Sequence, residues 1–292
     1  MLTEEQLNKF EEDGYLVIKD FINNEKCEEL KTEIDNVIET NNFLDQVKTI
    51  SVFLADENSA KAADEYFLTS VDKIRPFLES KAKEILEKND KSVKIFNKIG
   101  HALHALNPKF KEVTFDSKVK EIFESIGYKK PIVCQSMYIF KQPFIGGEVQ
   151  PHQDGSYLYT EPLKVTGIWI ALEDCTSHNG CLEFIPGSHK GPLVTRFIRN
   201  PNKEEFEAGK HLIYTNGIPK FSYDDSKFIP AEVKKGDAIL IDGLVVHRSA
   251  PNLSPNSRNI YTFHVYDSDN VDFSKENWME PNSISFLPLN EN

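Results

Sequence analysis

The chain has 292 residues, of which 39% are hydrophobic and 27% charged, and its formal net charge is −12. These values are ordinary for a soluble globular protein with a sizeable core. The acidic balance argues against nucleic acid or an anionic membrane as the main partner, and no apolar stretch approaches transmembrane length. The four cysteines have neither a disulfide framework nor a zinc spacing, which favours reduced thiols; they are Cys27, Cys134, Cys175 and Cys181.

The first part of the chain predicts helices. Thr3 has the position of an N-cap, with Gln6 at the capping-box position. Asn24 is the expected cap of a second helix. Further helical patterns run over 71–88 and 117–126, and Gly127 suits the end of the last one. The second helix has one apolar face, formed by Cys27, Leu30, Ile34, Val37 and Ile38.

Short β-like segments follow, at 132–141, 165–172, 182–185, 231–233, 238–241, 244–247 and 259–266. Helices followed by many short strands predict an α+β fold, a double-stranded β-helix (jelly roll, cupin-like) with N-terminal helices packed against it. We expect a single domain over 1–292, with 1–130 as mainly helical support, 131–270 as the jelly-roll core and 271–292 as a C-terminal tail. The polar stretch 198–225 is interpreted as a lid-like insertion.

A metal-binding pattern stands within the β-like region. His152 and Asp154 form a His-x-Asp pair, and His247 follows far downstream at the end of an apolar run. Two histidines and one carboxylate are the set that holds non-haem Fe(II) on one face and leaves the other positions open. In an extended chain, residues two apart project to the same side. The pair alone is a weak signal, but its place after the Gly146-Gly147 break supports the prediction of three metal ligands.

Arg258 opens the last β-like segment, shortly after His247. A fixed guanidinium grips both oxygens of a carboxylate, which suits a cosubstrate with a carboxylate remote from the metal. Together with the three ligands, Arg258 predicts an Fe(II)/2-oxoglutarate oxygenase site.

At these residues the chain resembles a known family. The stretch 152–190, HQDGSYLYTEPLKVTGIWIALEDCTSHNGCLEFIPGSHK, is similar to the phytanoyl-CoA dioxygenase family, and the similarity continues at 97–104, 247–249 and 258. The segment 180–189 is the most family-specific piece. The resemblance implies Fe(II), 2-oxoglutarate as cosubstrate and ascorbate as a candidate stimulant. It also implies that the metal is held by His152, Asp154 and His247 and that 2-oxoglutarate is bound by Lys98, Met137, Trp169, Ser249 and Arg258.

Other histidines allow alternative interpretations. His101 and His104 lie three positions apart, which raises a second metal site as an alternative, but we interpret them as structural. We expect His189 to tie down a turn and His264 to lie in the core or the pocket lining. Without the resemblance, Lys98 would be expected to extend toward solvent.

The predicted activity converts 2-oxoglutarate and O2 to succinate and CO2, coupled to hydroxylation of an unidentified small molecule other than phytanoyl-CoA. Fold-level analogy does not choose that substrate. The alternatives are an acyl-CoA 2-hydroxylase and a 2-oxoglutarate-binding or sensing protein with uncoupled turnover. The acidic start and the ending Leu-Asn-Glu-Asn match neither a signal peptide nor the Ser-Lys-Leu peroxisomal address, so we expect a cytoplasmic protein, as a monomer.

Overall fold

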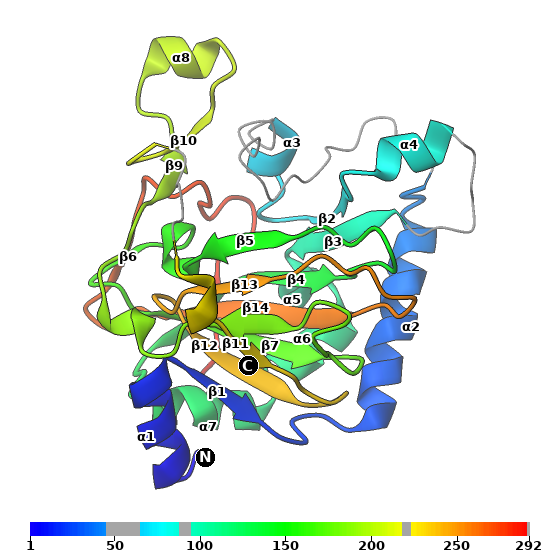
Figure 1. The fold of residues 1–292 in the computed structure, drawn as a ribbon. Helices are drawn as coiled ribbons and strands as arrows, with labels where there is room; N and C mark the ends of the chain where they lie inside the picture. Colours follow the sequence, from blue (N-terminus) through cyan, green and yellow to red (C-terminus); the bar gives the residue numbers. More distant parts are fainter. Residues whose placement is uncertain (45–64, 88–94, 218–222, 291–292) are drawn as a thin grey trace.

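The computed structural model describes residues 1–44, 65–87, 95–217 and 223–290. Its centre is a large antiparallel sheet that faces a smaller one (Figure 1). The large sheet has the order β1-β12-β7-β14-β4-β3-β2, and β16 also pairs with β4. Its strands are β1 (Tyr15–Ile18), β2 (Ile74–Leu78), β3 (Phe96–His101), β4 (Pro131–Ile139), β7 (Val165–Ala171), β12 (Ala238–Asp242), β14 (Ile260–Asp267) and β16 (Leu287–Pro288).

The smaller sheet has the order β11-β8-β13-β5 and lies over one face of the large sheet. Side chains of β7 alternate between two cores, as the pleat requires. Trp169 packs with Leu182 and Phe184 of the small sheet, whereas Ile168 and Ile170 pack toward the helices. Side chains from the large sheet and from the small sheet therefore pack together in the interior between them. The strands of the small sheet are β5 (Val149–His152), β8 (Leu182–Phe184), β11 (Ile229–Ala231) and β13 (His247–Ser249).

Helices cover the other face of the large sheet (Figure 1). They include α1 (Glu4–Asp13), α2 (Asn24–Thr40), α5 (Leu103–Leu106), α6 (Pro108–Thr114) and α7 (Ser117–Ser125). The expected capping box of Thr3 and Gln6 is present. The cap of α2 is Asn23 rather than the expected Asn24, and its side chain accepts from the Lys26 N–H. The predicted apolar face of α2 is buried as expected, and the α+β jelly-roll prediction is confirmed.

The helix expected over 71–88 is wrong. Within this range the chain instead forms the strand β2 and the short helix α4 (Ala82–Glu87), preceded by α3 (Glu65–Leu68), and residue 88 lies outside the described residues. Pro76 explains the difference, because proline removes a helical hydrogen bond and clashes with the preceding turn. It is tolerated in β2 because this strand ends the order of the large sheet, where one side of the strand needs no partner.

The N-terminal part is also less purely helical than expected, since β1, β2 and β3 all join the large sheet. The strand expected at 244–247 begins only at His247, because the turn at Asp242 continues: its side chain accepts from the Leu244 N–H and its carbonyl from the Val245 N–H. The strand expected at 231–233 is observed as β11, at 229–231. The remaining predicted strands are observed within about two residues.

The insertion at 198–225 contains regular structure. Strands β9 (Phe197–Arg199) and β10 (Leu212–Tyr214) form a hairpin with α8 (Lys203–Glu207) between them, and the hairpin projects from the body of the protein (Figure 1). The C-terminal tail packs back through β15 (Asp272–Phe273), which pairs with β6 (Thr160–Glu161). Short 3-10 turns occur at η3 (Asp154–Ser156), η4 (Ser188–Lys190) and η5 (Asp225–Lys227).

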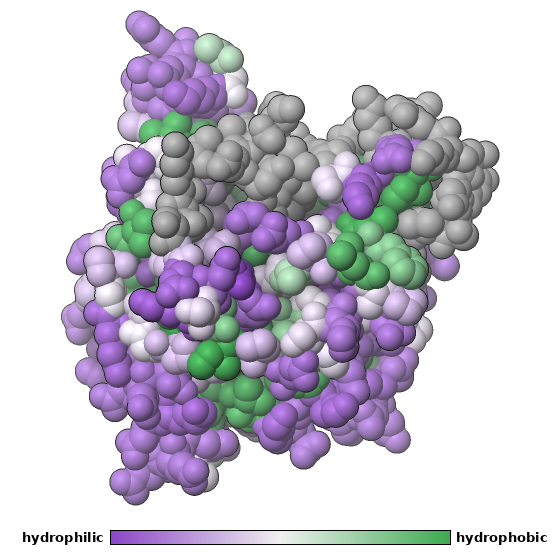
Figure 2. Space-filling view, in the orientation of Figure 1, coloured by the Kyte–Doolittle hydropathy of each residue, from purple (hydrophilic) through white to green (hydrophobic). Residues whose placement is uncertain are grey.

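Hydrophilic residues dominate the face seen in Figure 2. Among the helices of the described residues, none has both the length and the apolar character needed to cross a membrane.

Candidate active site

The two predicted histidine ligands face each other across the small sheet. His152 ends β5 and His247 begins β13, and the antiparallel register pairs them directly. Their ring centroids are 4.2 Å apart. Asp154 opens η3 just after β5, and its Oδ1 lies 3.6 Å from His152 Nε2 and 3.8 Å from His247 Nε2. The three ligand atoms thus lie within 4.8 Å of one another.

Backbone carbonyls set the orientation of both imidazoles. The Nδ1 of His152 lies 2.9 Å from the Gln150 carbonyl, and the Nδ1 of His247 lies 3.1 Å from the Val245 carbonyl. A carbonyl only accepts, so each Nδ1 carries the proton and donates it. Each Nε2 then keeps a lone pair directed toward the Asp154 carboxylate, which is the tautomer that a metal ligand needs.

His264 of β14 supports the carboxylate from the large sheet. Its Nε2 lies 3.2 Å from Asp154 Oδ2 and donates to it. Gly167 of β7 leaves room for this ring, since a Cβ there would lie 3.2 Å from it. Burial opposes ionisation of Asp154, which is 9% exposed. The neighbouring His264 imidazole, which attracts the carboxylate and donates to it, nevertheless holds the pKa of Asp154 well below the ordinary value.

The electrostatics fit a divalent metal. Burial, with repulsion from His152, lowers the pKa of His247 to about 4, so this imidazole is neutral at pH 7. Metal ligands must be deprotonated, and His247 and Asp154 meet that condition. Two imidazoles and one carboxylate are the donor set of the non-haem Fe(II) facial triad. The residues present therefore fit this metal.

Arg258 is a buried cation just before β14. It is 2% exposed, and its guanidinium lies 5.1 Å from the centroid of the Trp169 ring. Among the described residues, its Nε and Nη1 have no hydrogen-bond partner. Leaving buried charged donors unpaired is costly, so this arrangement fits an anionic ligand such as the carboxylate of 2-oxoglutarate.

The inner face of the large sheet carries three further predicted cosubstrate residues, Trp169, Met137 and Lys98. Thr262 pairs with both Trp169 and Met137 across the strands, and Gly100 pairs with Met137. Lys98 stands two residues before Gly100, on the same face. Its Nζ lies 3.7 Å from Met137 Sδ.

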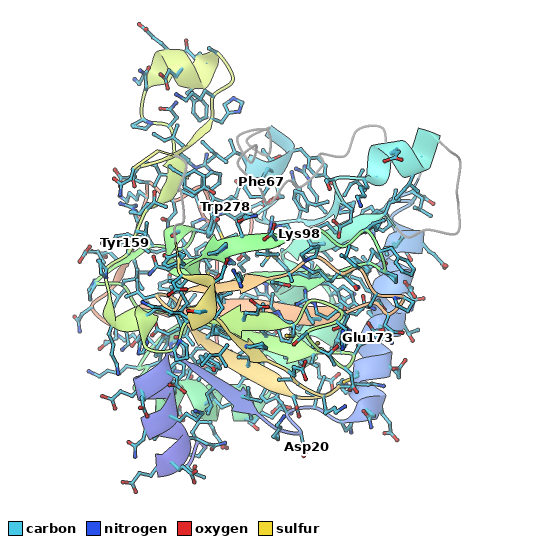
Figure 3. All side chains as sticks on the ribbon, viewed as in Figure 1. Asp20, Phe67, Lys98, Tyr159, Glu173 and Trp278 are labelled. Carbon is cyan, nitrogen blue, oxygen red and sulfur yellow. The ribbon has the colours of Figure 1, made fainter. Side chains whose placement is uncertain are left out.

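The surroundings of Lys98 are aromatic. Its Nζ lies 5.7 Å from the Phe67 ring and 5.2 Å from the Phe77 ring, and Phe67 stacks on Trp278 (Figure 3). Burial lowers the pKa of Lys98 to about 7. This lysine is therefore held inside the protein rather than extended to solvent.

Ser249 lies in β13, two residues after His247 and on the same side of the strand. Its hydroxyl donates to the Gly180 carbonyl over 2.8 Å. The Ser249 hydroxyl thus donates its proton to the family-specific segment 180–189, and its oxygen can still accept a hydrogen bond.

Three other histidines have contacts that fit structural roles. His101 Nδ1 is 2.8 Å from Ser70 Oγ, and its ring packs against Phe77 and Trp278. His104 Nδ1 is 2.8 Å from Ser136 Oγ. The 3-10 turn η4 is joined to α1 by His189, whose Nε2 lies 3.1 Å from the Glu11 carbonyl.

Sequence reasoning missed two buried charged residues beside the site. Lys141 follows β4 and is 2% exposed, and Glu79 follows β2 and is 1% exposed. Glu79 fell inside the wrongly expected helix, and a lysine after a strand ordinarily faces solvent. Nothing in their local sequence indicates burial.

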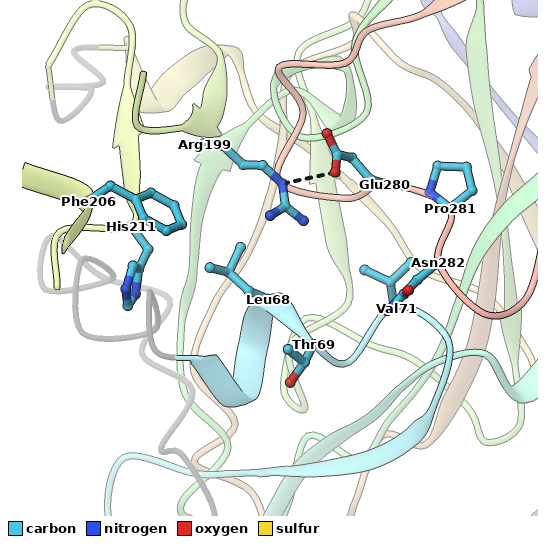
Figure 4. A pocket seen from close by; sticks show the side chains of 9 residues that line it. All are labelled: Leu68, Thr69, Val71, Arg199, Phe206, His211, Glu280, Pro281 and Asn282. Atoms are coloured by element: carbon cyan, nitrogen blue, oxygen red, sulfur yellow. Dashed lines mark ion pairs between the residues drawn. The ribbon is translucent and has the colours of Figure 1, made fainter. Parts of the chain in front are cut away.

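A pocket of about 430 Å³ lies beside the insertion rather than at the metal ligands (Figure 4). It is bounded by α3, the β9–β10 hairpin and the segment 280–282. The insertion also reaches the metal ligands through Tyr157, whose ring centroid lies 6.0 Å from that of His152 and 5.7 Å from that of Phe197. The pocket is lined by Leu68, Thr69, Val71, Arg199, Phe206, His211, Glu280, Pro281 and Asn282.

Comparisons with known proteins find relatives over most of the chain. A family model described as phytanoyl-CoA dioxygenase (PhyH) matches residues 10–260. The chain is 44% identical over 287 residues to phytanoyl-CoA dioxygenase domain-containing protein 1 of Danio rerio, covering 96% of this chain and 95% of that one.

Solved structures show the same fold. The non-haem α-ketoglutarate-dependent carbocyclase SnoK from nogalamycin biosynthesis aligns with a TM-score of 0.62 at 16% identity, covering 94% of this chain and 87% of its own. EctD from S. alaskensis with bound Fe aligns with a TM-score of 0.62 at 18% identity, covering 98% and 86%.

The fold and the family model together define the class of the protein, which is a dioxygenase built on a double-stranded β-helix. The chain belongs to the phytanoyl-CoA dioxygenase family, as its motifs predicted.

The contact between His264 and Asp154 generates a prediction about metal affinity. Replacing His264 with Leu removes the donor to Asp154 Oδ2, and loss of such an outer hydrogen bond weakens metal binding by about 10–100-fold. Titration of the purified protein with Fe(II) under anaerobic conditions measures this. His104→Leu is the control, because it too removes a buried imidazole. The hydrogen-bond partner of His104 is Ser136 rather than Asp154. Equal Fe(II) affinity in the two variants would contradict the assigned role of His264.

Proposed function

We propose that this dioxygenase holds Fe(II) through His152, Asp154 and His247 and converts 2-oxoglutarate and O2 to succinate and CO2. The observation that carries the proposal is the buried Arg258 guanidinium, whose Nε and Nη1 lack partners among the described residues, in the same interior as three converging metal ligands. When bound, the iron supplies the redox chemistry that activates dioxygen, which no amino-acid side chain provides.

The protein's own residues bind and orient. Arg258 would hold the distal carboxylate of 2-oxoglutarate with paired N–H donors. Trp169 packs on the guanidinium and keeps water from it. Lys98 and Met137 share the sheet face of Trp169 and would bound the cosubstrate, with Ser249 on the facing strand offering its oxygen. The donor His264 holds Asp154 in place, so that the carboxylate stays turned toward the two imidazoles.

We further propose that turnover is coupled to hydroxylation of a small molecule other than phytanoyl-CoA. A CoA thioester carries several phosphate charges and calls for a basic surface near the pocket. Two described cations at or next to the insertion are instead paired with acids: Arg196 with Glu276 at 2.8 Å and Lys210 with Glu205 at 2.9 Å. Arg199, which lines the pocket, faces Glu280 at 3.7 Å (Figure 4).

Two alternative functions are an acyl-CoA 2-hydroxylase and a 2-oxoglutarate sensor with uncoupled turnover. The experiments below distinguish them from the proposed function. A cytoplasmic location completes the proposal. It is supported by the cysteines, all of which are free thiols and buried, as suits a reducing compartment.

The metal assignment predicts about one Fe(II) per chain in the purified protein. Asp154→Ala and His247→Ala should each abolish 2-oxoglutarate turnover, because each removes a ligand. Succinate release measures turnover, and the thermal unfolding midpoint checks that the variants remain folded. Turnover that survives in both variants would rule out this metal site.

Arg258→Ala should raise the KM for 2-oxoglutarate by about one to two orders of magnitude. A charge-assisted bidentate pair contributes about 1.5–3 kcal/mol, at about 1.4 kcal/mol per decade. Arg258→Lys should also be impaired, because an ammonium does not reproduce the guanidinium fork. Iron content should stay at the wild-type level. An unchanged KM in both variants would show that another cation anchors the cosubstrate.

Phytanoyl-CoA should not stimulate 2-oxoglutarate decarboxylation above its basal rate. The assay measures succinate or CO2 with Fe(II), ascorbate and 2-oxoglutarate, with and without a panel of acyl-CoAs. Several-fold stimulation with a matching hydroxylated product would establish the acyl-CoA alternative. Stimulation by a pool of small metabolites would separate a coupled enzyme from a sensor, whose turnover would stay basal with every fraction.

A further inference from the structure

Lys141 is a buried lysine that the proposed mechanism leaves without a role. It follows β4, and its side chain turns inward to the space between the two sheets. The ammonium lies 2.6 Å from the Gly147 carbonyl and 3.5 Å from the Ser249 carbonyl and donates to both. Long charged side chains are seldom fully buried unless they are paired, so this position calls for an explanation.

Its contacts join the three segments that carry the site. Gly147 lies two residues before β5, which ends in His152, and Ser249 lies in β13 with His247. The main-chain carbonyl of Lys141 accepts from the Arg258 N–H over 3.3 Å. One residue therefore contacts the segments of both imidazole ligands and of the cosubstrate cation.

Glu79 holds the same glycine from the other side. Its Oε2 accepts from the Gly147 N–H over 3.1 Å, while the Gly147 carbonyl accepts from Lys141. The peptide groups of Gly147 thus link the carboxylate to the ammonium. Burial raises the pKa of Glu79, whereas hydrogen bonds from Gly147 and Asn97 and attraction by Lys141 and Arg258 favour its charged form.

Basic groups outnumber acidic ones in this buried cluster. Arg258 and Lys141 are basic, whereas Glu79 is the one acidic side chain that contacts the same glycine as Lys141. Glu148 also acts on Lys141 but is exposed, where water screens it.

The remaining nearby acid, Glu173, is already paired. It acts on Arg258, but its own partner is Lys31 at 2.9 Å. Burial and repulsion from Arg258 lower the pKa of Lys141 well below its ordinary value. One carboxylate bound at Arg258 would relieve that repulsion and balance the cluster.

We propose that Lys141 is a positioning residue of the 2-oxoglutarate site, which together with Glu79 sets the charge around Arg258 and so determines affinity for the distal carboxylate. This inference rests on the proposed function, because it takes 2-oxoglutarate as the ligand of Arg258. Lys141 acts on the cosubstrate through its charge and through its hydrogen bond to the Ser249 carbonyl, which holds β13 in place.

The test measures the Kd of 2-oxoglutarate by calorimetry on Mn(II)-loaded protein, so that binding is read without turnover. Lys141→Met keeps the chain length but removes the charge, and should weaken binding about tenfold. Glu79→Gln keeps an oxygen for the Gly147 N–H but removes the negative charge, and should tighten binding about threefold. Lys141→Arg should stay closer to wild type than Lys141→Met. The Mn(II) Kd should change less than about twofold.

Lys118→Met is the matched control. Its ammonium also donates to a main-chain carbonyl at 2.6 Å, that of Phe21, but it belongs to α7 on the helical face. It should leave 2-oxoglutarate binding unchanged. If Lys141→Met and Glu79→Gln both weaken binding, the two residues act as a purely structural clamp and the charge role is overturned. If Lys141→Met does not fold, Glu79→Gln alone tests the charge role. Tighter 2-oxoglutarate binding then supports that role, and weaker or unchanged binding overturns it.

The outcomes also separate this inference from the proposed function. A wild-type protein that does not bind 2-oxoglutarate, or an Arg258→Ala variant that binds it normally, contradicts the proposed function. When both behave as expected and Lys141→Met binds like wild type, the role of Lys141 alone is rejected.

Discussion

The antiparallel pairing of β13 with β5 is the contact on which the site depends. It sets His247 directly opposite His152, although the two lie far apart in the chain. Carbonyls of the same segments, at Gln150 and Val245, then turn both rings so that each Nε2 faces Asp154. A shift of the register by one residue would turn one imidazole to the opposite face of its strand. The phenylalanine opposite His247 on β8, Phe184, stacks on that ring at 5.6 Å and restricts its rotation.

The parts of the site that were predictable are those whose chemistry leaves a short pattern in the sequence. His152 and Asp154 stand two apart, a spacing that lets both reach one metal, and Arg258 stands just before a β-like segment, where a fixed cation can face the interior. Lys141 and Glu79 leave no such pattern. Their burial arises from contacts between β2, β4 and β5, which are distant in sequence, and a lysine or glutamate is usually at the surface.

The fold followed from the order of helical and β-like patterns, and its errors have local causes. Pro76 argues against a helix over 71–88, but the apolar spacing on which the prediction rests does not register it. Asn23 and Asn24 are equally good caps, and only the backbone decides which one bonds Lys26. At Asp242 the side chain extends a turn through hydrogen bonds that hydrophobic patterns do not register.

The two sheets contribute different residues to the candidate site. The small sheet carries both imidazoles, whereas the large sheet carries Arg258, Trp169 and the histidine that supports Asp154. Because an apolar core lies between the sheets, the proposed metal ligands and the proposed cosubstrate residues are held in fixed relation. The β9–β10 insertion lies at the edge of the two sheets and lines the pocket beside them. That hairpin meets the site at Tyr157, whose hydroxyl lies 3.3 Å from that of Tyr214, so a change in the hairpin alters what lies next to His152 while the ligands keep their positions.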